Sequence, residues 1–160
     1  MPELPSHLAL GRGSFPGPVA GGPLVYSFGP FDTSSAAGDV LHIAFPVSLD
    51  IRIQKITVRS RANGTPSAAV RFYQNSAASI TNATALAASI PNVDVAGNYT
   101  VAAAGGTVAF ASSTVRDVAK GQFIVGNYTY ATGAPATLVD HVVIIEAIAL
   151  GHVNDDPAND

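Results

Sequence analysis

Residues 51–58, with the sequence IRIQKITV, decide the fold of this chain. In an extended chain the first two isoleucines point to one face, whereas Ile56 and Val58 point to the other. The apolar face therefore changes sides across Gln54 and Lys55. A β-bulge, which adds one residue to a strand, returns both apolar pairs to a single buried face. A bend that carries the strand from one sheet into another produces the same change of side, and both interpretations predict a sandwich.

Apolar and polar residues also alternate in other parts of the chain. Leu41, Ile43 and Phe45 share one face of a predicted strand. Further strands are predicted at 68–74, 99–103, 107–111, 122–131 and 137–150, and the alanine-rich segment 81–90 suits a short helix as well as a weak strand. Turn residues separate these segments at short intervals. The pattern predicts an all-β fold, an antiparallel β-sandwich of jelly-roll type with about eight strands.

The segment Asn63–Pro66, NGTP, is a strong turn signal between two of these strands. Asn-Gly is common in the tight turns of β-hairpins because both residues tolerate positive φ angles. The strand that follows carries Val70 and Phe72 on one side. We therefore expect the strands on either side of this turn to pair as a hairpin.

The domain organisation follows from composition. Residues 1–30 contain six prolines and six glycines, which excludes a helix. This segment is either a disordered leader or an extended arm that orders on another subunit, and its many apolar residues favour the arm. The residues expected to bind a partner are Leu8, Leu10, Phe15, Val19, Leu24, Tyr26 and Phe28. We expect the sandwich domain to span 31–153 and a loose acidic tail to span 154–160.

Charge and cysteine content exclude several classes of function. Charged residues make up 12% of the 160 residues, and the net charge is −3 without a basic stripe, so we expect no nucleic-acid partner. No apolar run approaches the roughly 20 residues of a membrane helix, and we expect no membrane partner. The absence of cysteine excludes disulfides and thiolate metal sites. The start of the chain lacks the cationic pattern of a secretory signal, which indicates that it stays in the cytosol after synthesis.

No motif points to catalysis, a metal or a cofactor, and we predict no catalytic residues, metal ligands or cofactors. The four histidines show no paired spacing. Residues 92–97, NVDVAG, imitate the start of a calcium loop, but Ala96 and Ala103 stand where oxygen ligands are required. Asp39, Asp50 and Asp94 lie at predicted turns and strand starts, where aspartate commonly accepts backbone hydrogen bonds.

Two sets of polar residues leave alternatives open. Glu146 lies inside the apolar segment 142–150, and we expect either an internal salt bridge with Arg52, Arg59, Arg61 or Arg71, or an exposed position. Tyr99, Tyr128 and Tyr130 are candidates for surface contact or glycan stacking, with half-buried strand packing as the alternative.

The combination of a Gly/Pro-rich apolar arm with the segments 40–46, 51–59 and 120–125 and a long last strand resembles the small β-sandwich virion proteins of tailed bacteriophages, of the capsid decoration or cement type. This resemblance covers 26–153 and transfers no functional residue. It implies a non-enzymatic structural protein on the capsid exterior, assembled in the host cytoplasm. It also implies a homotrimer that binds the major capsid protein and bridges its subunits. The alternative is a carbohydrate-binding or fibre-tip receptor-binding module that uses the three tyrosines.

Overall fold

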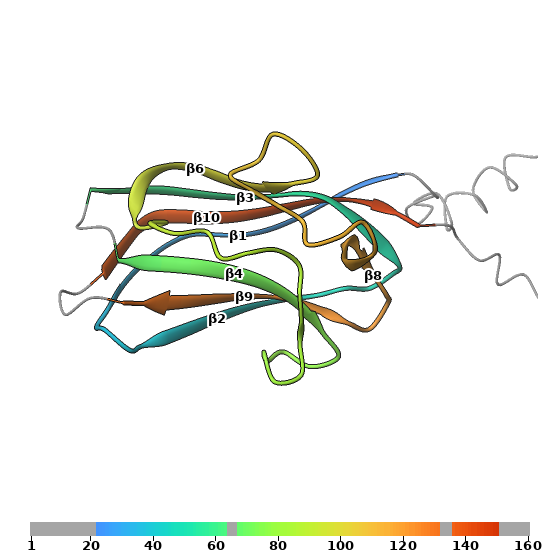
Figure 1. The fold of residues 1–160 in the computed structure, drawn as a ribbon, viewed down its shortest axis with the longest axis horizontal. Coiled ribbons are helices and arrows are strands. Elements are labelled where there is room, and N and C mark those ends of the chain that lie inside the picture. Colours follow the sequence, from blue (N-terminus) through green and yellow to red (C-terminus); the bar gives the residue numbers. More distant parts are fainter. Residues whose placement is uncertain (1–21, 64–66, 132–135, 151–160) are drawn as a thin grey trace, which may run out of the picture.

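The computed structural model describes residues 22–63, 67–131 and 136–150. Its strands form two sheets that face each other (Figure 1). The large sheet has the order β1 (Pro23–Ser35), β10 (Ala136–Ala149), β3 (Ile51–Asn63), β6 (Val95–Ala102) and β7 (Val108–Ala109), with β8 (Asp117–Val118) paired to β3. The small sheet has the order β2 (Val40–Pro46), β9 (Phe123–Tyr130), β4 (Ala68–Asn75) and β5 (Thr84–Ala85). All pairs are antiparallel except β6 with β7, and the predicted all-β sandwich is confirmed.

The predicted bulge lies in β3. Lys55 is opposite Glu146 and Ile53 is opposite Ala147, which leaves Gln54 as the extra residue. All four apolar residues of the IRIQKITV stretch are fully buried in consequence. The alternative of a bend between sheets is wrong, because β3 remains paired with β10 on both sides of the bulge.

The predicted alternation of β2 is also confirmed. Ile43 and Phe45 are buried in the core, Leu41 is half-buried, and His42 and Ala44 are exposed. The core between the sheets is filled from both sides, with Phe72 and Tyr128 of the small sheet among its largest fully buried side chains.

The expected hairpin around Asn63–Pro66 is wrong. β3 belongs to the large sheet and pairs with β10 and β6, whereas β4 belongs to the small sheet and pairs with β9. Residues 64–66 lie outside the described residues. The turn signal predicts where a strand ends, but it does not determine the sheet that the next strand joins, because that depends on distant partners.

The segment 81–90 contains the two-residue strand β5 and no helix in its described structure. Its backbone pairs with β4 instead: Leu86 N donates to Phe72 O at 2.8 Å and Ile90 N donates to Val70 O at 2.8 Å. These hydrogen bonds, together with the burial of Leu86, Ala87 and Ile90, outweigh the helix propensity of the alanines.

The sandwich begins earlier than the expected boundary at residue 31. Pro23 to Phe28 pair continuously with Ile148 to Val143 of β10, so these residues belong to the domain and not to a separate arm. The expected arm residues before Gly22 and the expected tail 154–160 lie outside the described residues.

Deletion of Gln54 tests the role of the bulge. Without this residue, two of the four apolar residues in the stretch must turn toward solvent, and we expect a loss of at least about 3 kcal/mol in the free energy of unfolding. Gln54→Ala keeps the residue count and loses only half-buried hydrogen bonds, so its cost stays below about 1 kcal/mol. Urea denaturation measures both values, and equal stability of the two variants would contradict the prediction.

Candidate functional site: the open side of the sandwich

The aspartates singled out in the sequence have structural roles. Asp39 Oδ2 accepts from Ala36 N at 2.8 Å within its own turn, as expected. Asp50 Oδ1 accepts from Lys120 N at 2.8 Å, across 70 positions of the chain. Asp94 is fully buried and accepts hydrogen bonds from the backbone at the start of β4. Among the described residues, no group of three His, Cys, Asp or Glu side chains is arranged to hold a metal.

Asp94 belongs to the segment that imitates a calcium loop, but its carboxylate oxygens are occupied by the protein. They accept from the backbone N of Ser67 at 3.0 and 3.2 Å and from the backbone N of Ala68 at 3.1 Å. These bonds satisfy donors at the beginning of β4 that have no strand partner there. Asp94 therefore fixes the entry of the chain into the small sheet.

Glu146 is exposed, which agrees with the second of its two interpretations. Its Oε2 atom lies 3.5 Å from Lys55 Nζ, and both side chains are about half exposed. The counterion is none of the four expected arginines, because the bulge places Lys55 opposite Glu146 in the ladder. Such an exposed pair contributes little to stability.

The three tyrosines do not form a stacking platform. Tyr128 and Tyr130 are buried, and both belong to β9 of the small sheet. Tyr99 lies on β6 of the large sheet, is half-buried against the core, and donates its hydroxyl to Val95 O at 3.0 Å. The prediction of a glycan or surface-contact role is wrong for Tyr128 and Tyr130, because their strand turns them into the core.

A buried hydrogen bond connects the two sheets. The hydroxyl of Tyr128 on β9 lies 2.7 Å from Nε2 of His141 on β10, and both side chains are fully buried. Burial lowers the pKa of His141 to about 4, so the imidazole is neutral at pH 7. The sequence analysis missed this pair, although the alternation of His141 with the inward-facing Val143 and Ile145 signals its direction.

The pH dependence of stability tests the state of His141. The unfolded chain binds a proton near pH 6.5 and the native chain near pH 4, so stability is lost as the pH falls between these values. We expect a loss of up to about 3 kcal/mol in the free energy of unfolding from this group. Urea denaturation at several pH values measures this loss. His141→Gln should abolish the pH dependence between pH 6.5 and 4, whereas His42→Gln, at an exposed position, should retain it. The same pH dependence in all three proteins would contradict the assignment.

The two sides of the sandwich differ in how they are closed. Beside β5 and β7 the sheets are joined by an isolated bridge between Ala87 and Phe110, and Ala111 N donates to Leu86 O at 2.8 Å. On the other side, the edge strands β1 and β2 are connected by the turn at 36–39, and no backbone ladder joins them within the described residues. We call this side, formed by β1 and β2, the open side.

All exposed large apolar side chains of the described residues lie on the open side. Val25 and Phe28 of β1 are 66% and 46% exposed, and Val40 of β2 is 56% exposed. Neither strand contains a lysine or arginine. Natural sheets commonly protect their edges with charged residues, especially lysine, because an unpaired edge is a template for another strand. The open side is therefore the strongest candidate for a protein contact.

Three expected arm residues lie within β1. Leu24 and Tyr26 are half-buried against the core of their own chain, and Phe28 packs edge-on against Phe31 at 5.2 Å between ring centroids. Leu24 and Tyr26 are therefore parts of the sandwich, whereas Phe28 remains available at the edge. Gly29 follows with a φ of +110°, and a side chain there would collide with the backbone carbonyl of His141.

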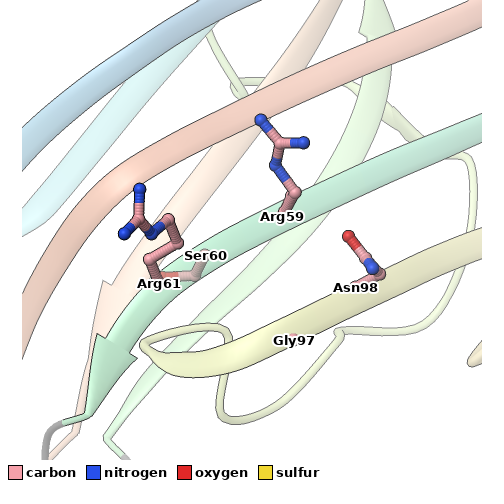
Figure 2. Close-up of a pocket in the computed structure, with 5 residues that line it drawn as sticks. All are labelled: Arg59, Ser60, Arg61, Gly97 and Asn98. Atoms are coloured by element: carbon pink, nitrogen blue, oxygen red, sulfur yellow. The ribbon is translucent and has the colours of Figure 1, made fainter.

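The outer face of the large sheet holds a shallow depression of about 320 Å³. It is lined by Arg59, Ser60, Arg61, Gly97 and Asn98. Figure 2 shows both guanidinium groups and the Asn98 amide on the same side of β3 and β6. Arg61 Nη1 contacts Asp140 Oδ2 at 3.0 Å. The guanidinium groups and the Asn98 amide are hydrogen-bond donors that could bind an anion.

Comparison with known proteins does not identify the function of this chain. No protein-family model and no curated protein matches the chain. A chain in the structure of infectious bursal disease virus strain Gx is similar at 14% identity and a TM-score of 0.43, over 81% of this chain and 33% of that chain. A chain of strain Gt is similar at 13% identity and a TM-score of 0.23, over 88% of this chain and 46% of that chain. This chain thus spans less than half of either viral chain. Within the described residues, no helix has the length and hydropathy needed to cross a membrane.

Proposed function

We propose that this protein is a non-enzymatic structural protein of a virion, of the capsid decoration or cement type, and that it acts through contacts of the open side. The observation that carries the proposal is that Val25, Phe28 and Val40 are exposed on two edge strands that contain no lysine or arginine. A strand edge of this kind favours pairing with another protein chain. The virion assignment rests on the resemblance of the sequence to phage decoration proteins.

The expected oligomer is a homotrimer with the three open sides facing its axis. β1 and β2 are different surfaces, so β1 of one subunit meeting β2 of the next is a head-to-tail contact, which closes when the rotation between subunits is 120°. A decoration protein binds the assembled shell and not its free subunits, and it therefore stabilises the shell by mass action. The major capsid protein is the proposed partner, on the capsid exterior.

The arm residues Leu8, Leu10, Phe15 and Val19 remain proposed contacts with the major capsid protein. They precede β1, which runs along the open side. In this arrangement the sandwiches form the trimer, and the segments before Gly22 extend from it toward neighbouring shell subunits.

Lysine substitutions on the open side test the proposed contact. Val25→Lys together with Val40→Lys places two charges where the proposed interface excludes water, and we expect the trimer to dissociate, with at least a tenfold weaker association. Because both side chains are exposed in the single chain, the free energy of unfolding should change by less than about 1 kcal/mol. Light scattering on a sizing column measures the mass. Ala109→Lys, on the opposite edge strand β7, is the matched control and should remain trimeric.

A monomeric full-length protein, or a trimer that tolerates both lysines, would overturn this proposal. A monomer that binds a glycan array through its surface would instead support the carbohydrate-binding alternative.

Truncation at two positions separates the arm from the sandwich. A chain lacking residues 1–21 keeps all of β1, and we expect it to fold and to remain trimeric. A chain lacking residues 1–30 loses six ladder positions against β10 and the packing of Leu24 and Tyr26, and we expect it to be several kcal/mol less stable. Thermal unfolding and light scattering distinguish the two. Equal stability of both truncations would place the domain boundary at 31 after all.

A further inference from the structure

We propose that the depression around Arg59 binds the carboxylates of Asp155 and Asp156 from a second copy of this chain. The inference deepens the proposed function, since it rests on the chain assembling with itself. It names a second contact between subunits, separate from the open side.

The distribution of charge is the first argument. The described residues contain seven basic and seven acidic side chains, and Glu3 and Arg12 cancel outside them. The net charge of −3 therefore belongs to Asp155, Asp156 and Asp160. The sandwich is neutral, and only the segment after Val153 carries an excess of charge.

Most basic side chains of the sandwich have a polar partner within it. Ion pairs join Arg52 to Asp117, Lys55 to Glu146 and Arg61 to Asp140, while Arg71 and Arg116 donate to the backbone oxygens of Ala87 and Ile53. Among the described residues this leaves the side chains of Arg59 and Lys120 without a polar partner. Lys120 lies in the turn before β9, whereas Arg59 lies beside Arg61 at the depression.

The local geometry suits a carboxylate. Arg59 lies directly opposite Asn98 in the ladder between β3 and β6, and both residues line the depression. The guanidinium and the Asn98 amide are both hydrogen-bond donors, and Figure 2 shows them on one face. A guanidinium can hold a carboxylate through two parallel hydrogen bonds.

The length of the chain decides that the carboxylates come from a second copy. Val142 is opposite Arg59 and Ala149 is opposite Ile51, so Leu150 lies about 26 Å from the site along β10. Figure 1 shows the ends of β3 and β10 at opposite ends of the sheet. The six residues from Leu150 to Asp156 span at most about 22 Å, and a turn back along the sheet takes up about two of them. The aspartate pair of the same chain therefore falls short of Arg59.

The test measures a fluorescent peptide of residues 153–160, VNDDPAND, by anisotropy at low ionic strength. The acceptor is the full-length chain with Asp155→Asn and Asp156→Asn, so that these residues of neighbouring copies do not compete with the peptide. We expect saturable binding that weakens about fivefold or more when Arg59→Gln is added. The peptide VNNNPANN should not bind, and Lys120→Gln, which removes the same charge elsewhere, should leave the affinity unchanged.

Several outcomes would overturn the inference. Equal binding with and without Arg59→Gln would exclude this site, and equal weakening by Lys120→Gln would show nonspecific attraction. Binding of inorganic phosphate that depends on Arg59, without binding of VNDDPAND, would identify a phosphate site instead.

A mixing experiment tests the second-copy requirement and keeps this contact distinct from the open side. Full-length Arg59→Gln and full-length Asp155→Asn/Asp156→Asn each lack one half of the contact, and their mixture should regain a salt-sensitive association that neither shows alone. Failure of the mixture to associate would overturn docking between copies. Val25→Lys/Val40→Lys should leave peptide binding unchanged, so the failure of one contact does not imply the failure of the other.

Discussion

The extra residue at Gln54 is the constraint on which the rest of this structure depends. β3 is an interior strand of the large sheet, paired with β10 on one side and with β6 and β8 on the other. Because side chains alternate along a strand, the bulge determines the direction of every residue after it. It turns Ile56 and Val58 into the core, and it turns Arg59 to the outer face. The same shift places Lys55 opposite Glu146. The bulge therefore determines both which side chains enter the core and which side chains pair on the outer surface.

The sandwich has two unequal sides, and this asymmetry directs the functional interpretation. The bridge between Ala87 and Phe110 connects the sheets beside β5 and β7, whereas β1 and β2 present their edges to the surroundings. An edge strand without lysine or arginine promotes unwanted association in a protein that functions as a monomer. In a protein that assembles, the same edge is a binding surface, which is why the open side carries the proposal.

The polar residues that first suggest chemistry stabilise the fold instead. Asp94 accepts hydrogen bonds from the start of β4, and the Tyr128 hydroxyl meets His141 between the sheets. A buried polar group is costly unless it is paired, so such pairs favour one arrangement of the sheets over its alternatives. Asp94 holds the start of β4 in the small sheet, and the Tyr128–His141 pair connects the two sheets. All three side chains are buried.

The sequence by itself determined what depends on neighbouring residues. Alternation predicted the strands, and the parity change predicted either a bulge or a bend at Gln54. The tertiary structure decided what depends on residues far apart: the placement of β3 and β4 in different sheets, the inclusion of Leu24 and Tyr26 in the sandwich, and the burial of Tyr128 and Tyr130. Likewise, Arg59 and Asn98 are 39 positions apart in the sequence and become neighbours only through the pairing of β3 with β6. Local periodicity fixes which way a side chain points relative to its own strand, but only the pairing of distant strands determines whether that direction leads to the core, to solvent or to another subunit.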